Sequence, residues 1–265
     1  MSAVGQLSPG TLETALRQSR DLGRKLLIPY VTGGLGHDWL DVVRAIASAG
    51  ADAIEIGIPF SDPVMDGPVI QQASVQALSS GATPALIIAA LAGVDAGVPL
   101  VVMTYYNIVL RAGHRRMASR LADAGVSGAI VPDLALEELD DWADEADAAG
   151  VETVLLVAPT TPEDRLKAIC GRSRGFVYGV GVMGVTGERA QLGDAGLGVA
   201  ARCKRETDTP VLVGVGISTP GQAREVVAVA DGVVVGSALV HRLLEGAGPE
   251  GAARFVAEIR AAIDR

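Results

Sequence analysis

Two acidic residues close together in the sequence are the first candidates for chemistry. Glu55 interrupts the apolar run Ile54-Glu-Ile-Gly-Ile58, and Asp66 lies eleven positions further on, in the segment Phe60 to Pro68. Side chains of a strand alternate between its two faces, so the isoleucines face outward and Glu55 faces the axis of a barrel. Burial there raises the pKa of a carboxyl group toward neutral pH. The pattern predicts carboxylate acid–base chemistry.

Both acidic residues also have a purely structural interpretation. Glu55 could be a buried carboxyl group satisfied by a hydroxyl group, such as that of a tyrosine. Asp66 stands before Gly67 and could be only a turn residue, and Asp62 before Pro63 is interpreted in that way. The sequence leaves these alternatives open.

Glycine-rich turns late in the chain are candidates for binding a phosphate group. The segment Gly214-Val-Gly216-Ile-Ser218 and the pair Gly236-Ser237 each follow a predicted strand. Adjacent backbone N–H groups and a helix N-terminus can hold an anion without any lysine. Tight strand-to-helix turns are the competing interpretation.

A further glycine-containing segment, Met183-Gly-Val-Thr-Gly-Glu188, lies between Glu55 and these motifs in the sequence. Its glycines are consistent with a movable lid, and a plain connector is the alternative.

Other chemistries lack the residues that they need. The chain has three lysines, and none stands at a strand end, where a Schiff-base aldolase requires one. The three histidines are scattered through loop and helix sequence, so we expect no metal site. A dinucleotide or Walker motif is also missing, so we expect no nucleotide cofactor.

Eight short apolar runs provide the frame that must position these residues. Each run is closed by Gly, Pro or Asp, as in parallel strands covered on both faces. The runs are Leu26–Val31, Ala53–Ile58, Leu100–Tyr105, Gly128–Val131, Thr153–Val157, Phe176–Val180, Val211–Val215 and Asp231–Val235. Ala-rich helical segments alternate with them, which predicts an α/β fold consisting of one (β/α)8 TIM barrel over residues 1–265. A doubly wound open sheet is the alternative.

Helical patterns add detail to the predicted barrel. Leu12–Leu22 predicts an extra N-terminal helix over the barrel bottom, and the length of the segment from 67 to 97 predicts two helices between the second and third strands. Asp38 is a candidate N-cap for a helix ending at Ser48. The run Ser218-Thr-Pro-Gly predicts a helix start with a hydroxyl cap and an early proline.

Composition restricts the class of protein. The 265 residues are 49% hydrophobic, which excludes a disordered chain, and their net charge of −9 argues against nucleic acid or an anionic membrane as a partner. No apolar stretch approaches the roughly 18 residues of a membrane span. Two cysteines, Cys170 and Cys203, form no disulfide framework, so we expect a cytoplasmic protein.

The motifs taken together resemble those of the tryptophan synthase α subunit family. The resemblance rests on Ile54-Glu-Ile-Gly-Ile-Pro-Phe-Ser-Asp-Pro-Val-Met-Asp-Gly-Pro68, Ile28-Pro-Tyr-Val-Thr-Gly-Gly34, Val131-Pro-Asp133, Met183-Gly-Val-Thr-Gly187 and Gly216-Ile-Ser218. It implies a cofactor-free TIM barrel that cleaves indole-3-glycerol phosphate to indole and glyceraldehyde 3-phosphate in tryptophan biosynthesis.

The resemblance also implies roles for individual residues. Glu55 matches the acid/base that protonates indole C3 and handles the glycerol hydroxyl proton, and Asp66 matches the carboxylate that engages the indole N–H. Tyr178, grouped with them as catalytic, and Tyr30 match aromatic residues lining the site. Thr186 matches the lid hydroxyl that meets the aspartate. The phosphate-binding positions of the family correspond to Gly187, Gly216, Gly236 and Ser237.

The family's usual partner is a β subunit that carries pyridoxal phosphate and receives indole in an αββα heterotetramer. The segment Phe60–Pro68 and the segment after the third strand match the contact region. The chain departs from the family pattern at Met65, Ile108 and Val182. A free-standing lyase that supplies indole to secondary metabolism, a non-catalytic allosteric partner and another phosphate-binding barrel enzyme are therefore kept as alternatives.

Overall fold

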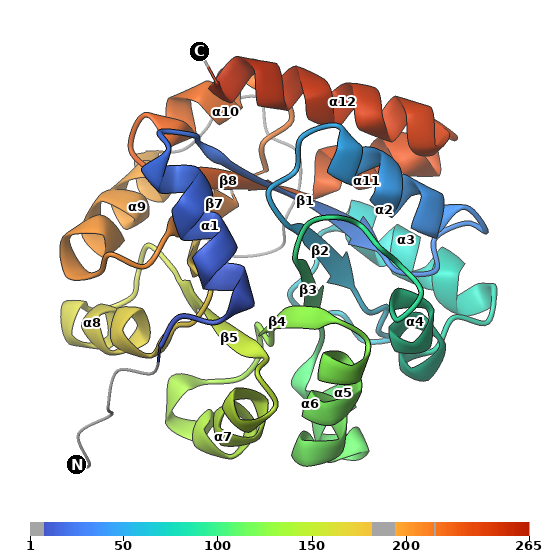
Figure 1. Ribbon diagram of the computed structural model, residues 1–265, viewed down its shortest axis with the longest axis horizontal. Helices are drawn as coiled ribbons and strands as arrows, with labels where there is room; N and C mark the ends of the chain where they lie inside the picture. The colour runs from blue at the N-terminus through green and yellow to red at the C-terminus, as the bar shows by residue number, and fades with distance from the viewer. Residues whose placement is uncertain (1–7, 182–193, 215, 265) are drawn as a thin grey trace.

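Eight parallel strands close into a barrel in the order β1 to β8, surrounded by helices (Figure 1). The computed structural model describes residues 8–181, 194–214 and 216–264. The strands are β1 (Leu26–Thr32), β2 (Ile54–Gly57), β3 (Leu100–Met103), β4 (Val126–Ile130), β5 (Glu152–Val157), β6 (Val177–Val180), β7 (Val211–Gly214) and β8 (Gly232–Val235). Each predicted apolar run overlaps one strand. Because β8 pairs with β1, the predicted TIM barrel is confirmed and the open sheet is wrong.

The helices follow the predicted alternation with some additions. They are α1 (Thr11–Asp21), α2 (Trp39–Ser48), α3 (Pro68–Ser79), α4 (Pro84–Leu91), α5 (Tyr106–Ala112), α6 (His114–Asp123), the short 3-10 helix η1 (Leu136–Glu138), α7 (Asp140–Ala148), α8 (Glu163–Arg172), α9 (Asp194–Glu206), α10 (Pro220–Val227), α11 (Ser237–Leu244) and α12 (Gly248–Ile263). The extra helix α1 and the pair α3 and α4 confirm two predictions. The division of one connection into α5 and α6 was not predicted, and it occurs at Gly113, whose φ of +84° suits glycine.

Two helix caps were predicted from the sequence, and the structure shows a side-chain capping bond at one of them. Thr219 caps α10 in a capping box with Gln222, and Pro220 follows at the first helical position, as predicted. Asp38 stands directly before α2, but its side chain makes no capping hydrogen bond. Asp38 is therefore the N-cap residue, as predicted, but its φ and ψ of −100° and 10° lie outside the extended region in which the side chain would reach back to the helix.

Two apolar layers hold the barrel together. The outer layer lies between the strands and the helices and contains Ile54 and Ile56, both fully buried. The inner layer fills the barrel itself, and two leucines of α1, Leu12 and Leu16, belong to it. Figure 1 shows α1 lying across the barrel in front of the strands. This helix therefore closes the end of the barrel from which the strands start, as predicted.

A buried carboxylate from β5 holds α1 in this position. Glu152, only 3% exposed, accepts hydrogen bonds from the backbone N–H groups of Gly10, Leu12 and Glu13, with the shortest at 2.6 Å from Leu12. These donors belong to the start of α1, where an α-helix leaves its first N–H groups without internal partners. A residue 139 positions from Glu13 along the chain thus acts as the helix cap.

Removal of this remote cap should destabilise the fold. We expect Glu152→Ala to lower the free energy of unfolding by about 3 kcal/mol, because several buried N–H groups lose a charged acceptor. Urea unfolding followed by circular dichroism measures the loss. Glu152→Gln is the matched control, since it keeps the shape and one carbonyl acceptor and should lose less. An alanine variant as stable as the wild type would contradict this function of Glu152.

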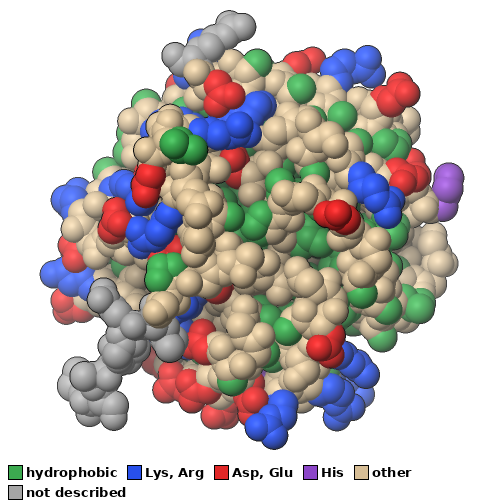
Figure 2. Space-filling model, in the orientation of Figure 1, with side chains coloured by type: hydrophobic (Ala, Val, Ile, Leu, Met, Phe, Trp, Pro, Cys, Tyr) green, Lys and Arg blue, Asp and Glu red, His purple; other side chains and the backbone are tan. Residues whose placement is uncertain are grey.

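The surface has two features that bear on the class of protein. On the face drawn in Figure 2, basic side chains are interspersed with acidic ones. No single helix in the described part of the chain is long and apolar enough to cross a membrane. Together, α3 and α4 are long and apolar enough to span a membrane, but the two helices are bent by 92° relative to each other.

Candidate active site

One pocket brings together all of the predicted site residues that lie in the described part of the chain. Its lining consists of Tyr30, Glu55, Asp66, Ile70, Met103, Tyr178, Gly214, Gly216, Val234, Gly236 and Ser237. The residues come from β1, β2, β3, β6, β7 and β8 and from the segments that follow β2, β7 and β8. A TIM barrel places its functional groups at this end of the strands. Thr186 and Gly187, as well as Val182, lie outside the described residues.

Glu55 occupies the position that strand alternation predicts. Its neighbours Ile54 and Ile56 are fully buried in the outer apolar layer, whereas Glu55 lines the pocket and is 1% exposed. The parallel register places Tyr30 of β1 beside it, with Val101 of β3 on its other side. The carboxyl group is therefore fixed by two neighbouring strands rather than by a flexible loop.

The surroundings of Glu55 favour its protonated form. Burial, with a smaller contribution from the negative charge of Asp66, raises the pKa of Glu55 to about 8. Its buried Oε2 atom has no hydrogen-bond partner among the described residues. The structural alternative, a carboxyl group satisfied by a tyrosine hydroxyl, finds no support at this oxygen. A carboxyl group with these properties can exchange a proton near neutral pH.

Asp66 combines the two functions that the sequence left open. Its backbone N–H donates to the carbonyl oxygen of Pro63 at 3.1 Å, so the residue does form a turn. Its side chain nevertheless lines the pocket and is less buried than Glu55. Burial raises the pKa of Asp66 to about 6, and a hydrogen bond from Tyr105 acts in the opposite direction. At neutral pH Asp66 is therefore ionised in most molecules while Glu55 is mostly protonated.

Tyr105 holds Asp66 in place, a role that the sequence did not suggest for it. Its hydroxyl group donates to Asp66 Oδ2 at 3.1 Å and accepts from the backbone N–H of Met65 at 3.0 Å. Its ring stacks on Phe60 with the ring centroids 5.0 Å apart. The one available signal was its place at the end of the third predicted strand, where functional groups of a barrel gather.

Removal of the Tyr105 hydroxyl should change the titration of Asp66. We expect Tyr105→Phe to raise the pKa of Asp66 by about one pH unit, because the carboxylate loses a hydrogen bond that favours its charged form. Carboxyl-carbon NMR titration measures this change. Tyr106→Phe is the matched control, since the Tyr106 hydroxyl pairs with His114 at 3.1 Å instead. If Asp66 had the same pKa in both variants, the effect assigned to the Tyr105 hydrogen bond would be contradicted.

Two glycines make room for the aromatic walls of the pocket. A Cβ atom added at Gly57 would overlap the hydroxyl group and ring of Tyr30. One added at Gly214 would lie 2.5 Å from the hydroxyl oxygen of Tyr178. Both tyrosines can therefore lie over the barrel interior only because the neighbouring strand carries glycine at these positions. Burial, as the largest effect, and the nearby carboxylates raise the pKa of both tyrosines, which keeps them neutral.

Backbone from the ends of β7 and β8 forms the part of the pocket between Tyr178 on β6 and Tyr30 on β1. Gly216 has a φ of +67°, a conformation that favours glycine. Gly236 directly precedes α11, and Ser237 is its first residue. The first N–H groups of an α-helix have no partner inside the helix and can bind an anion. The pocket lining contains no Lys, Arg or His among the described residues, so the predicted use of backbone dipoles is consistent with this part of the pocket.

Comparison with known proteins agrees with this geometry. The family model described as "Tryptophan synthase alpha chain" matches residues 16–262. The tryptophan synthase alpha chain of Thermobifida fusca is 40% identical over 262 residues, which cover 95% of this chain and 97% of the relative. That of Streptomyces coelicolor is 42% identical over 261 residues, 94% of each chain.

Solved structures give the same result. A chain of Mycobacterium tuberculosis tryptophan synthase superposes with a TM-score of 0.89 at 37% identity, covering 97% of this chain and 99% of that one. The tryptophan synthase alpha chain of Legionella pneumophila superposes with a TM-score of 0.86 at 29% identity, covering 97% and 98% of the two chains. The chain therefore belongs to the tryptophan synthase alpha chain family.

Proposed function

We propose that Glu55 and Asp66 are the acid–base pair with which this chain cleaves indole-3-glycerol phosphate to indole and glyceraldehyde 3-phosphate. The reaction is the carbon–carbon lyase step of the family in tryptophan biosynthesis. One observation carries the assignment of the residues: two carboxyl groups face one pocket and differ in burial and pKa. Such a pair can divide acid and base functions at a single pH.

The proposed proton transfers balance without a cofactor. Protonated Glu55 gives its proton to indole C3, which places positive charge on the ring nitrogen, and ionised Asp66 stabilises the N–H group there. The carboxylate of Glu55 then accepts the proton of the glycerol hydroxyl group. The carbonyl of glyceraldehyde 3-phosphate forms as the C3–C3′ bond breaks, and the bond electrons restore the aromatic ring. Glu55 ends the cycle protonated, ready for the next substrate.

The remaining residues bind and enclose the substrate. Tyr30 and Tyr178 provide aromatic surface for the indole ring. Backbone N–H groups at Gly216, Gly236 and Ser237 hold the phosphate group. Two further assignments lie outside the described residues and rest on the family resemblance: the hydroxyl group of Thr186 meets Asp66 when the lid closes, and Gly187 contributes to the phosphate site.

The direct test is to incubate the chain with indole-3-glycerol phosphate and to follow release of indole. We expect turnover in the wild type and a large loss in Asp66→Asn. Asp62→Asn is the matched control, because Asp62 is an exposed carboxylate in the same segment that does not line the pocket. Equal loss in both variants, or no indole from the wild type, would contradict the proposal.

We further propose that a β subunit carrying pyridoxal phosphate docks over the segments after β2 and β3, in an αββα complex. Three large apolar side chains are exposed there, which favours a protein contact: Val64 at 75%, Met65 at 44% and Leu110 at 56%. Solved relatives include a structure described as tryptophan synthase. The chain itself then needs no cofactor.

Adding a β subunit tests this proposal. We expect the β subunit to raise the turnover of the chain, and Leu110→Glu to weaken this stimulation by placing a charge in the contact. High basal turnover with no stimulation would favour a free-standing lyase that supplies indole to other products. A non-catalytic allosteric partner is disfavoured, since a binding module has no need of a buried carboxyl group.

Two broader assignments complete the proposal. One is that residues 1–265 form one domain, which the closed barrel of eight strands supports. The other is that the protein works in the cytoplasm, a compartment in which its two buried free cysteines are returned to the reduced state.

A further inference from the structure

The two cysteines of the chain lie against each other between neighbouring helices. Cys170 is on α8 and Cys203 on α9, 2% and 0% exposed, and both belong to the outer apolar layer. Of the side chains that act on the titration of each thiol group, the other cysteine has the largest effect. They are the only cysteines in the sequence and are 33 positions apart. Packing alone does not require two thiols to meet at one point of a core, since alanine or valine would fill such a position.

The two helices are fixed relative to each other close to this thiol pair. Arg202, next to Cys203 on α9, donates from Nε to Glu163 Oε1 at 2.8 Å at the start of α8. The same guanidinium group donates to the carbonyl oxygens of Pro159 at 3.1 Å and Thr161 at 2.5 Å. These bonds hold α9 against the start of α8 and the segment that precedes it.

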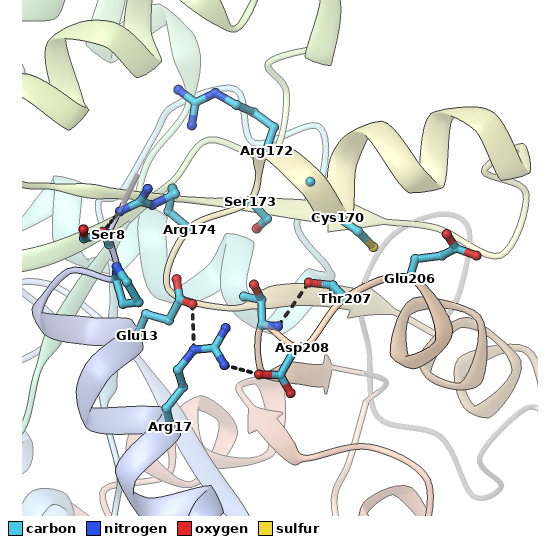
Figure 3. A pocket seen from close by; sticks show the side chains of 13 residues that line it. Ser8, Glu13, Arg17, Cys170, Arg172, Ser173, Arg174, Glu206, Thr207 and Asp208 are labelled. Atoms are coloured by element: carbon cyan, nitrogen blue, oxygen red, sulfur yellow. Dashed lines mark hydrogen bonds and ion pairs between the residues drawn. The ribbon is translucent and has the colours of Figure 1, made fainter. Parts of the chain in front are cut away.

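One of the thiols also borders a hollow that opens at the far end of the barrel from Glu55. The hollow measures about 580 Å³ and lies between α1 and the turns that follow α8 and α9. Figure 3 shows Cys170 on its lining, with its sulfur atom toward Glu206. A small polar oxidant in the hollow can therefore approach the edge of Cys170, whereas Cys203 does not line the hollow and is 0% exposed.

We propose that Cys170 and Cys203 form a reversible dithiol site that hydrogen peroxide closes to a disulfide between α8 and α9. The Cys170 thiolate attacks one peroxide oxygen, the O–O bond breaks, and the released hydroxide takes up a proton to give water. The sulfur of Cys203 then displaces hydroxide from the sulfenic acid of Cys170, and its own proton leaves with that hydroxide as a second water. Two thiols lose two electrons, and one peroxide molecule gains them.

The opposite pKa shifts of the two thiols agree with Cys170 reacting first and Cys203 second. The interaction with Cys203, as the largest effect, lowers the pKa of Cys170, and the same interaction raises the pKa of Cys203. The thiolate is the reactive form of cysteine, so the accessible member of the pair is also the better nucleophile. Cys203 acts second, as the resolving thiol.

The test uses the reduced full-length chain exposed to hydrogen peroxide. The chain is then unfolded, alkylated and analysed by mass spectrometry without reductant. We expect both thiols of the wild type to escape alkylation, a mass lower by two hydrogen atoms, and one cross-linked peptide that joins Cys170 to Cys203. Dithiothreitol should restore both thiols. The oxidised chain should also show an apparent Tm higher by roughly 5 °C, since the cross-link restricts the unfolded chain.

Two single variants assign the order of reaction. In Cys203→Ser, peroxide should give a sulfenic acid at Cys170 that dimedone traps, whereas Cys203 in Cys170→Ser should stay a free thiol. Equal dimedone labelling of both variants would overturn the assignment of Cys170 as the attacking residue. Two wild-type thiols that stay open to alkylation, a sulfinic acid at Cys170 beside free Cys203, or disulfide-linked dimers would each overturn the dithiol site.

Discussion

Glu55→Gln is expected to lower kcat for indole release at least ~100-fold, which corresponds to about 2.7 kcal/mol of transition-state stabilisation. The amide has the size of the carboxyl group but can neither give a proton to indole C3 nor take one from the glycerol hydroxyl group. KM should change little, because the aromatic walls and the backbone phosphate site are left intact. Steady-state kinetics with indole-3-glycerol phosphate measures both parameters.

The stability of the same variant separates lost chemistry from lost structure. The pKa of Glu55 is raised to about 8 by folding, so the proton that it binds stabilises the folded state. This stabilisation is complete below the ordinary glutamate pKa and is lost as the pH rises through about 8. The amide side chain carries no charge at any pH, so Glu55→Gln should unfold at the same or a higher temperature than the wild type above pH 8. Near-normal turnover, or a marked fall in Tm, would contradict the acid–base assignment.

Asp66→Asn should also lower kcat by ~100-fold or more, for a different reason. The ionised carboxylate stabilises positive charge on the indole nitrogen, and a neutral amide loses this electrostatic stabilisation. The variant should in addition lower the pKa of Glu55, because the charge of Asp66 contributes to its raised value. Carboxyl-carbon NMR and kinetics measure the two effects. An unchanged titration of Glu55 would show that the two groups do not interact as the structure indicates.

The parts of the site that follow from local sequence could be predicted. The run Ile54-Glu-Ile-Gly-Ile58 determines, by alternation, that Glu55 and Gly57 face the barrel axis. Strand ends bounded by glycine also indicated the positions of Gly216 and Gly236. These inferences need only the two-residue period of a strand and the rule that a parallel barrel gathers its functional groups at one end.

Contacts between distant segments could not be predicted in the same way. The hydrogen bond from Tyr105 to Asp66 joins residues 39 positions apart, and the cap that Glu152 provides for α1 spans about 140. No local period or cap motif encodes such pairs. The missing capping bond at Asp38 has a related cause, since residue type alone suggested a cap and the backbone angles decide whether the side chain can form the bond.

The burial of Glu55 lowers the stability of the fold while it serves the proposed activity. Glu55 is buried in its pocket with one oxygen that has no hydrogen-bond partner among the described residues, an arrangement that costs folding free energy. An apolar cluster occupies the barrel interior, from Leu12 at one end to Val234 near the pocket. The chain thus keeps an unfavourable carboxyl group at this position of the barrel, and the proposed proton transfer explains why.

The pH dependence of kcat/KM, measured for the wild type and for Glu55→Gln, tests the central claim most directly. Glu55 must be protonated and Asp66 ionised, so the wild-type rate should rise through about pH 6 and fall through about pH 8. The substrate phosphate also titrates near pH ~6, which makes the alkaline limb the decisive one. The account predicts a limb near pH 8 that is absent in Glu55→Gln. A wild-type profile that is flat through pH 8, or the same limb in both proteins, would contradict it.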